Sequence, residues 1–258
     1  MGISEAKPLT TRFAAEFVQE PVLSLLNVCQ SYGTTSVIEN LTFSIRKHEF
    51  LAIVGPSGCG KSTLLRLMAG HEQPLSGRVH HTGKVLTITQ HGGLLPWMTS
   101  GENVDLALRN VRRREEREVA RAQMLELVGM SGSADTYPHE LSGGMRQRIE
   151  LARALAGSSE VLLMDEPFSA LDYLTRLQMR RELVRILADQ PRTVVFVTHD
   201  VEEAAQLADR VIVLTARPAG LRLELVPGGD VRPRPLTGET VTDSVKKLLQ
   251  SLGMEDRT

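Results

Sequence analysis

A glycine-rich loop between an apolar run and a helix-forming segment constrains the fold of this chain more than any other feature. The loop reads Gly55-Pro56-Ser57-Gly58-Cys59-Gly60-Lys61-Ser62 and fits the pattern G-x-x-x-x-G-K-[ST]. It follows the continuous apolar run 50–54, which is typical of a strand buried on both faces, and it opens the helix-forming segment 61–69. The order strand, loop, helix predicts an α/β domain built around a phosphate-binding loop.

The residue types of this loop suit the phosphates of ATP and a magnesium ion. Glycines allow positive φ and close approach of the backbone, and N–H groups at a helix N-terminus attract anions. Lys61 supplies a charge for the β- and γ-phosphates, and the Ser62 hydroxyl is a hard oxygen ligand for Mg²⁺. A glycine-rich turn with a chance Lys-Ser pair is the alternative, which the strand–loop–helix context disfavours. The predicted ATP-binding residues of the loop are Gly55, Pro56, Ser57, Gly58, Cys59, Gly60, Lys61, Ser62 and Thr63.

Strand and helix patterns alternate in the second half of the chain. Apolar runs lie at 161–164, 193–197 and 210–214, and helical patterns lie between them at 173–188 and 201–208. This alternation favours a mainly parallel sheet with helices on its faces. The first half adds strand patterns at 22–28, 36–45 and 78–89, and helical spacing over 100–130. We therefore predict an α/β fold: a P-loop NTPase core with a mainly parallel sheet, an antiparallel β part and an inserted α-helical subdomain.

These patterns divide the chain into three parts. We predict an N-terminal extension at 1–20, an ATPase domain at 21–220 with its helical subdomain at about 91–158, and a short C-terminal tail at 221–258. The charged run 112–117 has neighbours of opposite sign, which favours a solvated helix start or turn over a nucleic-acid patch. The sequence contains no internal repeat, so the chain holds one such domain.

Composition excludes several classes of protein. The chain has 30 basic and 31 acidic residues, which gives no electrostatic reason to expect a nucleic-acid partner. No run approaches the roughly 18 apolar residues that span a bilayer, and the N-terminus lacks a secretory signal pattern. The two cysteines, Cys29 and Cys59, indicate no disulfide framework. We expect a cytosolic chain that meets a membrane only through another subunit.

Polar residues follow three of the predicted strands. Asp165 and Glu166 end the strand at 161–164, where adjacent carboxylates are costly unless cations or polar groups meet them. His199 follows the strand at 193–197, where an imidazole can hydrogen-bond a phosphate or a water molecule. Gln90 follows the strand pattern at 78–89. The alternatives are strand ends and a loop that simply meet solvent, and the phosphate loop in the same chain disfavours them.

A second helix start with bare N–H groups is predicted at Leu141-Ser142-Gly143-Gly144-Met145. Ser142 is a good N-cap for a helix over 145–156, and the two glycines leave backbone N–H groups uncovered. An ordinary helix cap is the alternative. These five residues, placed between the phosphate loop and the Asp165–Glu166 pair, resemble the signature of ABC-transporter ATP-binding subunits. The resemblance covers about residues 22–214.

This resemblance implies a role for the polar residues at the strand ends. Asp165 supports Mg²⁺ through the water shell of the metal, and Glu166 is the general base that polarises the attacking water. His199 contacts the γ-phosphate and the attacking water. Gln90 is a metal-associated residue that senses Mg²⁺ and the γ-phosphate and links the core to the helical subdomain.

The resemblance also implies that two cassettes pair head to tail around two ATP molecules. Ser142, Gly143 and Gly144 then contact the γ-phosphate of an ATP held by the second subunit, which is a second copy of this chain or a different cassette. Asp172 ends the D-loop (169–172), which runs along the interface. Tyr32 stacks on adenine, with a packed core tyrosine as the alternative. Met145 stands where the family usually has Gln, which leaves the Ser and Gly groups of the signature untouched.

The segment Leu94-Leu95-Pro96-Trp97 resembles ATPases of importers for nitrate, sulfonates, taurine and bicarbonate. In that family this region faces the permease. Trp97 either does so or packs the helical subdomain, and both alternatives remain open. The implied partners are transmembrane permease subunits and, indirectly, a solute-binding protein, at the cytoplasmic face of the inner membrane. The solute stays undetermined because the ATPase does not touch it.

Three other classes compete with an importer ATPase. A soluble ABC-type ATPase usually carries two cassettes or a long coiled-coil insertion, and neither is present in the sequence. A P-loop kinase or GTPase leaves the signature segment and His199 without a role. A regulatory subunit that binds ATP without turnover is disfavoured because Glu166 and His199 are both present. The favoured function is ATP hydrolysis that powers solute import through a separate permease, with the soluble ABC-type ATPase as the alternative.

Overall fold

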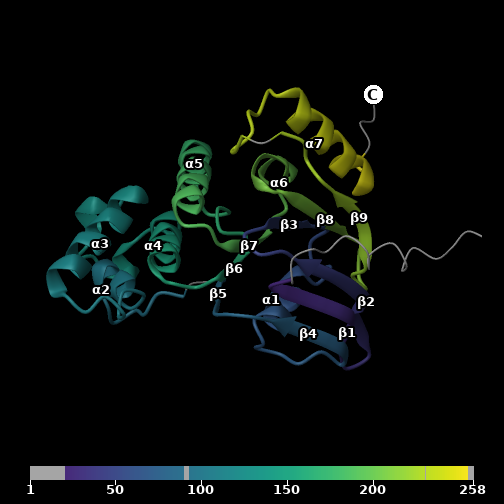
Figure 1. Ribbon diagram of the computed structural model, residues 1–258, viewed down its shortest axis with the longest axis horizontal. Helices are drawn as coiled ribbons and strands as arrows, with labels where there is room; N and C mark the ends of the chain where they lie inside the picture. Colours follow the sequence, from purple (N-terminus) through teal and green to yellow (C-terminus); the bar gives the residue numbers. More distant parts are fainter. Residues whose placement is uncertain (1–20, 90–92, 230, 255–258) are drawn as a thin grey trace, which may run out of the picture.

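The computed structural model describes residues 21–89, 93–229 and 231–254, and it contains two β-sheets with helices beside and between them (Figure 1). The strands are β1 (Leu23–Tyr32), β2 (Thr35–Ile45), β3 (Phe50–Val54), β4 (Ser76–His81), β5 (Val85–Ile88), β6 (Val161–Asp165), β7 (Thr193–Val197), β8 (Arg210–Leu214) and β9 (Leu221–Leu225). The α-helices are α1 (Lys61–Met68), α2 (Ser100–Asp105), α3 (Arg114–Leu127), α4 (Gly143–Ala156), α5 (Tyr173–Asp189), α6 (Val201–Leu207) and α7 (Glu239–Ser251). Single 3-10 turns lie at Ser131–Ser133 and Pro138–Glu140.

A six-stranded sheet in the order β5-β6-β7-β3-β8-β9 carries the strands that end near the predicted site. Its first five strands are parallel to one another, which confirms the predicted mainly parallel sheet. Every residue of β3, β6, β7 and β8 is buried, as expected for strands with helices on both faces. Because the carboxyl ends of parallel strands share one edge, the segments that follow β3, β6 and β7 meet there.

The last strand of this sheet, β9, is not predicted from the sequence. It pairs antiparallel with β8 and is only half-buried or exposed along its length. Its apolar residues alternate with Arg222 and Glu224 between segments rich in Pro and Gly, so the run has none of the continuous apolar character of β3 or β7. The segment predicted as a tail from residue 221 thus contributes a strand to the central sheet.

A second, antiparallel sheet has three strands in the order β2-β1-β4 and lies beside the first (Figure 1). Leu23, Leu41 and Ile45 of this sheet are fully buried in one core with Leu64 of α1. The same core includes Leu51 from the parallel sheet. The predicted antiparallel β part is therefore present, and α1 lies between the two sheets.

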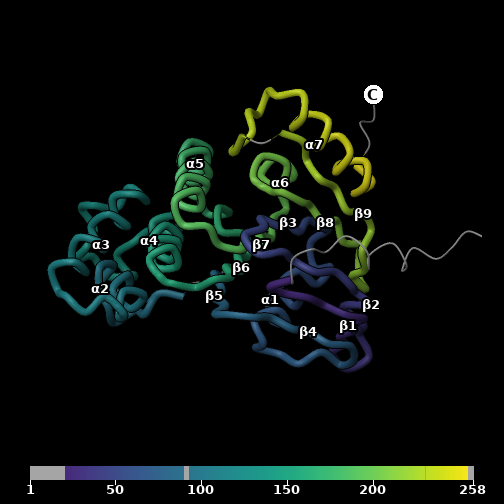
Figure 2. The backbone as a smooth tube through the Cα atoms, viewed as in Figure 1, coloured from purple at the N-terminus to yellow at the C-terminus, as the bar shows by residue number. Residues whose placement is uncertain are grey.

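The helical part consists of α2, α3 and α4, between β5 and β6 in the chain. Figure 2 shows the chain leaving the central sheet after β5 and returning to it at β6. α4 contacts both α2 and α3, and its residues Ile149 and Leu155 share a core with Phe168 of the ATPase core. α3 begins at Arg114 inside the charged run 112–117, whose side chains form exposed ion pairs with Glu116 and Glu118, as predicted for a solvated helix start.

The C-terminal segment is fastened to α6. α7 contacts α6, and the buried guanidinium of Arg234 donates hydrogen bonds to the carbonyls of Ala205 and Ala208 at the end of α6. Such a contact places a positive charge at a helix C-terminus, where the helix dipole favours it. Within the described residues, every helix is too short or too polar to cross a bilayer.

Candidate nucleotide site

The phosphate loop turns sharply between β3 and α1. Gly58 has φ 72° and Gly60 has φ 123°, in the region that L-residues other than glycine rarely adopt. A Cβ on Gly60 would also lie 2.9 Å from Cγ1 of Val37 in β2. Both the backbone angle and the close approach of β2 therefore require glycine at position 60.

Lys61 is buried at the start of α1, and its ammonium group is held by the loop itself. Its Nζ donates to the carbonyls of Gly55 at 2.8 Å and Pro56 at 3.0 Å. No side chain caps α1, so the N–H groups of its first turn remain free of a side-chain acceptor. The loop thus presents a positive charge and backbone donors on the same side, which is the arrangement that binds a polyphosphate.

Asp165 lies at the carboxyl end of β6, within reach of the phosphate loop. Burial raises the pKa of the Asp165 carboxyl, and the charge of Glu166 adds to this effect, whereas a hydrogen bond from Ser62 and the charge of Lys61 oppose it. The described residues contain no cluster of three His, Cys, Asp or Glu side chains that could hold a metal. The hydrogen bond between Ser62 and Asp165 places two hard oxygens side by side, which fits Mg²⁺ that shares its remaining positions with phosphate and water.

Glu166 and His199 come from neighbouring strands and face each other. β6 pairs with β7 through Asp165 and Val197, and the Glu166 N–H donates to the Val197 carbonyl at 2.9 Å. Nδ1 of His199 lies 3.3 Å from Oε1 of Glu166. Glu166 has φ 49°, a left-handed conformation that costs a non-glycine residue free energy and persists only where neighbours hold it. The structure thus brings together the predicted base and the predicted histidine at the edge that carries the phosphate loop.

Tyr32 ends β1 on the surface. Its side chain is 46% exposed, which disfavours the alternative of a packed core tyrosine. Its hydroxyl donates to the carboxylate of Glu72 and accepts a hydrogen bond from Arg66 of α1 at 3.3 Å. Arg66 and Glu72 form an ion pair at 2.6 Å, so an α1 side chain fixes the tyrosine beside the helix that follows the phosphate loop.

The signature segment is a helix start that faces solvent. Ser142 caps α4 by accepting a hydrogen bond from the N–H of Met145 at 3.2 Å, and Ser142 and Gly143 are exposed. α4 lies in the helical part, well apart from α1 and its phosphate loop (Figure 1). Met145 is half-buried against the core of the helical part, so the residue that differs from the usual family pattern does not belong to the exposed group. The two helix starts predicted to bind anions therefore do not form a single site within one chain.

Other predicted residues have different outcomes. Asp172 caps α5 and accepts hydrogen bonds from the hydroxyl and N–H of Thr175, which lower the pKa of its carboxyl. Trp97 is 69% exposed, which disfavours the alternative in which it packs the helical subdomain. Gln90 lies outside the described residues, so its predicted role stays a prediction.

Two contacts of the site are not predicted from the sequence. Arg217, after β8, donates from Nη2 to the Gly58 carbonyl in the phosphate loop at 2.7 Å. Gln147 of α4 contacts the backbone of Glu166. Both contacts join segments distant in sequence, and a single arginine or glutamine carries no pattern that points to such a contact.

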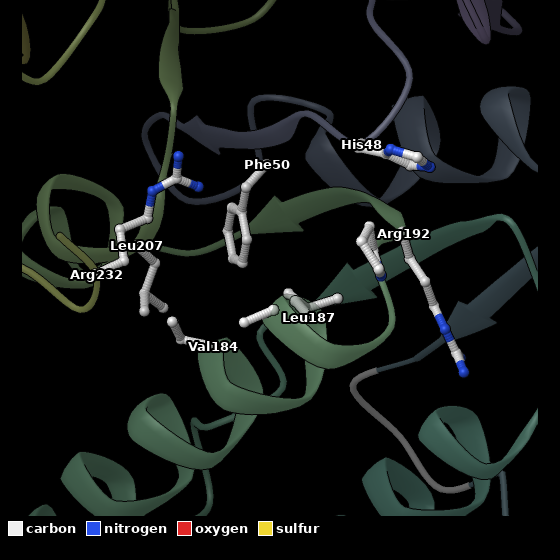
Figure 3. A pocket seen from close by; sticks show the side chains of 9 residues that line it. His48, Phe50, Val184, Leu187, Arg192, Leu207 and Arg232 are labelled. Carbon is white, nitrogen blue, oxygen red and sulfur yellow. The ribbon is translucent and has the colours of Figure 1, made fainter. Parts of the chain in front are cut away.

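A separate cavity of about 310 Å³ lies at the opposite edge of the parallel sheet. Figure 3 shows Val184 and Leu187 of α5 pointing toward Phe50, the first residue of β3. His48 and Arg192 lie at its rim. The Arg192 guanidinium donates hydrogen bonds to the carbonyls of Ala154 and Leu155 at the end of α4. Because the phosphate loop follows the other end of β3, this cavity is not the nucleotide site.

Comparison with known proteins gives consistent results. Residues 38–169 match the family described as ABC transporter. The chain is 47% identical over 199 residues to an aliphatic sulfonates import ATP-binding protein of Rhodococcus jostii, covering 75% of this chain and 79% of that protein. It is 40% identical over 228 residues to a bicarbonate transport ATP-binding protein of Synechocystis, covering 82% of this chain and 80% of the other. Among solved structures, a dimeric ATP-binding cassette described as a post-hydrolysis state bound to ADP and Pi is 29% identical, with a TM-score of 0.73, and covers 81% of this chain and 100% of its own.

Proposed function

This chain belongs to the ABC transporter family and is an ATP-hydrolysing subunit of that family, and we propose that it powers import of a small anion through a separate membrane permease. The observation that supports an ABC-type ATPase most directly is that one chain carries both a phosphate loop that holds Lys61 and an exposed signature segment. A kinase or GTPase has no use for the second feature.

The proposed catalytic roles follow from the geometry of the strand ends. Lys61 leaves the Gly55 and Pro56 carbonyls and pairs with the ATP phosphates, since a phosphate is a stronger partner for an ammonium than a carbonyl. Ser62 would ligate Mg²⁺ and Asp165 would support it through its water shell, and the ion would neutralise charge on the phosphates. Glu166 orients and deprotonates the attacking water. His199, whose Nδ1 lies 3.3 Å from Oε1 of Glu166, contacts both this carboxylate and the γ-phosphate and so fixes their relative position.

Pairing of two cassettes completes each site. The exposed helix start at Ser142 and Gly143 approaches the γ-phosphate of an ATP that lies on the phosphate loop of the other subunit. ATP then binds two surfaces at once and favours the closed pair, and hydrolysis removes that bridge. A relative whose cassette is solved as a dimer in two structures supports this arrangement.

A permease is the proposed route to the membrane. Trp97, exposed in the segment 94–97, offers an apolar contact of the kind that anchors protein interfaces. The proposed solute is a small anion such as an alkanesulfonate or bicarbonate, because the relatives named for those solutes are 40–47% identical to this chain. A solute-binding protein delivers it to the outer side, and the chain lies at the cytoplasmic face of the inner membrane.

The experiment is reconstitution with a candidate permease of an alkanesulfonate or bicarbonate importer from the same organism. Purified complex in liposomes, with ATP and Mg²⁺ on the side of the cassette, is expected to take up labelled ethanesulfonate or bicarbonate in the presence of its binding protein. Glu166→Gln is expected to lower hydrolysis and uptake together, by about 100-fold or more. Lys84→Ala, at an exposed lysine, is the matched control.

Two outcomes separate the alternatives. Hydrolysis with no uptake of either anion contradicts an alkanesulfonate or bicarbonate as the solute. A chain that hydrolyses ATP and never purifies with a permease favours the soluble ABC-type ATPase instead.

A further inference from the structure

The signature helix α4 is fastened to the turn that carries the predicted catalytic base. Gln147, five residues after the cap Ser142, is buried, and both ends of its amide are used. Its Nε2 donates to the backbone carbonyl of Glu166 at 3.0 Å, and its Oε1 accepts from the backbone N–H of Ala170 at 3.0 Å. One side chain therefore fixes both ends of the 166–170 turn to α4.

The strained residue Glu166 is held from the neighbouring strand as well: its N–H donates to the Val197 carbonyl, and its carboxylate faces His199. The Glu166 carbonyl also accepts hydrogen bonds from the N–H and the hydroxyl of Ser169, at 3.1 and 2.9 Å, both within the same turn. Among the described residues, Gln147 of α4 donates to the same carbonyl from another element. Because Glu166 has φ 49°, its conformation depends on contacts of this kind.

A second contact joins the same two segments independently. A Cβ on Gly144 would lie 2.9 Å from the Ala170 carbonyl oxygen and 3.4 Å from Cδ2 of Leu171. The backbone of the signature segment thus packs directly against the D-loop, at a distance that only glycine permits. A shift of the first turn of α4 must displace the D-loop or break this contact.

We propose that Gln147 is a positioning residue that transmits the state of the signature segment to the catalytic turn of the same chain. The inference rests on the proposed head-to-tail pairing: Ser142 meets the ATP of the other subunit, whereas Glu166 acts on the ATP of its own subunit. Gln147 then couples the two ATP sites of the pair, since docking of one signature sets the Glu166 conformation in the other site. The groups proposed to contact ATP lie in the phosphate loop and at Ser142, Gly143 and Gly144, so ATP binding and closure of the pair do not require the Gln147 amide.

The test replaces Gln147 by residues of similar size. Gln147→Met removes both hydrogen bonds, and Gln147→Glu keeps an acceptor for the Ala170 N–H but cannot donate to the Glu166 carbonyl. Both variants of the full chain are expected to lower kcat at least 10-fold while KM for ATP stays within twofold. In the Glu166→Gln background, Gln147→Met is expected to form the ATP-bound dimer at the same ATP concentration as Glu166→Gln alone.

Arg148→Met is the matched control, because it removes hydrogen bonds from α4 to the Val128 and Gly129 carbonyls without touching the catalytic turn. It is expected to keep kcat within twofold of the wild type. If Gln147→Met fails to fold, as judged by circular dichroism, Gln147→Glu alone decides.

Failure of the inference and failure of the proposed function have different signatures. Wild-type kcat in Gln147→Glu or in a folded Gln147→Met overturns the inference, and so does a loss of ATP-dependent dimerisation that parallels the loss of kcat. If the wild-type protein hydrolyses ATP but the Glu166→Gln variant does not dimerise with ATP, the proposed pairing is overturned instead.

Discussion

The two glycine-rich helix starts of this chain differ in what surrounds them. At the start of α1 the loop closes on a buried lysine whose ammonium is satisfied by two carbonyls of the loop. At the start of α4 the cap Ser142 and Gly143 face solvent. Among the described residues, no lysine or arginine side chain forms a hydrogen bond or ion pair with them. In the proposed function, the first start holds the polyphosphate of its own chain, whereas the second meets the ATP that another subunit holds.

In the proposed pair, one chain therefore carries parts of two ATP sites. Both starts use the same chemistry, N–H groups at a helix N-terminus, yet they lie on different parts of the molecule (Figure 1). Binding and closure are therefore separable properties, and substitutions at the two starts must affect them differently.

The largest effect is expected from Lys61→Ala. Loss of the charge-assisted contact with the phosphates weakens ATP binding to the isolated chain by about 10- to 100-fold and removes measurable hydrolysis. Isothermal titration with ATP and a phosphate-release assay measure the two losses, with Lys84→Ala as the control at an exposed lysine. Unchanged ATP affinity in Lys61→Ala would remove the phosphate loop from the binding site.

A contrasting effect is expected from Ser142→Arg. The bulky side chain blocks the exposed helix start, so hydrolysis falls about 100-fold, while the monomer still binds ATP within about twofold of the wild-type affinity. The same two assays apply, and Ser131→Arg in an exposed 3-10 turn is the matched control. A parallel loss of ATP binding by the monomer would mean that the signature belongs to the ATP site of its own chain, and that the two helix starts do not serve different subunits.

A smaller effect is expected from Arg217→Ala. This change removes the hydrogen bond from Arg217 to the Gly58 carbonyl. Because that hydrogen bond is exposed to solvent, its loss should raise the ATP dissociation constant only about threefold and change kcat little. Arg222→Ala, at an exposed arginine of β9, should leave the affinity as it is. Equal effects of both substitutions would show that general charge, and not the contact with the loop, is responsible.

The smallest effect concerns stability at Glu150, which joins α4 to the N–H of Gly93. Burial raises the pKa of the Glu150 carboxyl, although the hydrogen bond from Gly93 and the charge of Arg153 oppose it. Its stabilising contribution is therefore complete below the ordinary glutamate pKa of about 4.3 and is lost as pH rises through the raised value. The free energy of unfolding of Glu150→Gln, relative to wild type, should rise between about pH 4 and pH 7.

Urea unfolding of both proteins across this range measures that difference. A difference that is constant with pH, or that falls as pH rises, is the contradicting result.

Local patterns were sufficient for much of the fold. The runs predicted at 50–54, 193–197 and 210–214 coincide with β3, β7 and β8, because strands buried on both faces are continuously apolar. β9 was missed because an edge strand that is half exposed reads like its Pro- and Gly-containing surroundings. The phosphate loop could be located from the strand–loop–helix order alone.

Contacts between distant segments could not be predicted in the same way. The hydrogen bonds from Gln147 to Glu166 and from Arg217 to Gly58 depend on how α4 and the β8–β9 connection pack, which no local pattern encodes. The left-handed conformation of Glu166 is likewise a property of its tertiary setting, since glutamate has no preference for positive φ. The sequence therefore points to candidate groups for the chemistry, whereas the structure adds the contacts that hold those groups in place.

The most direct test of an ATP site completed across two chains is the mass of Glu166→Gln in solution, measured by light scattering with and without ATP. The predicted result is a monomer of 28.4 kDa without nucleotide and a species of twice that mass with ATP, lost again when Ser142→Arg is added. A Glu166→Gln protein that binds ATP and stays monomeric, or a Ser142→Arg double variant that dimerises equally well, would contradict the account.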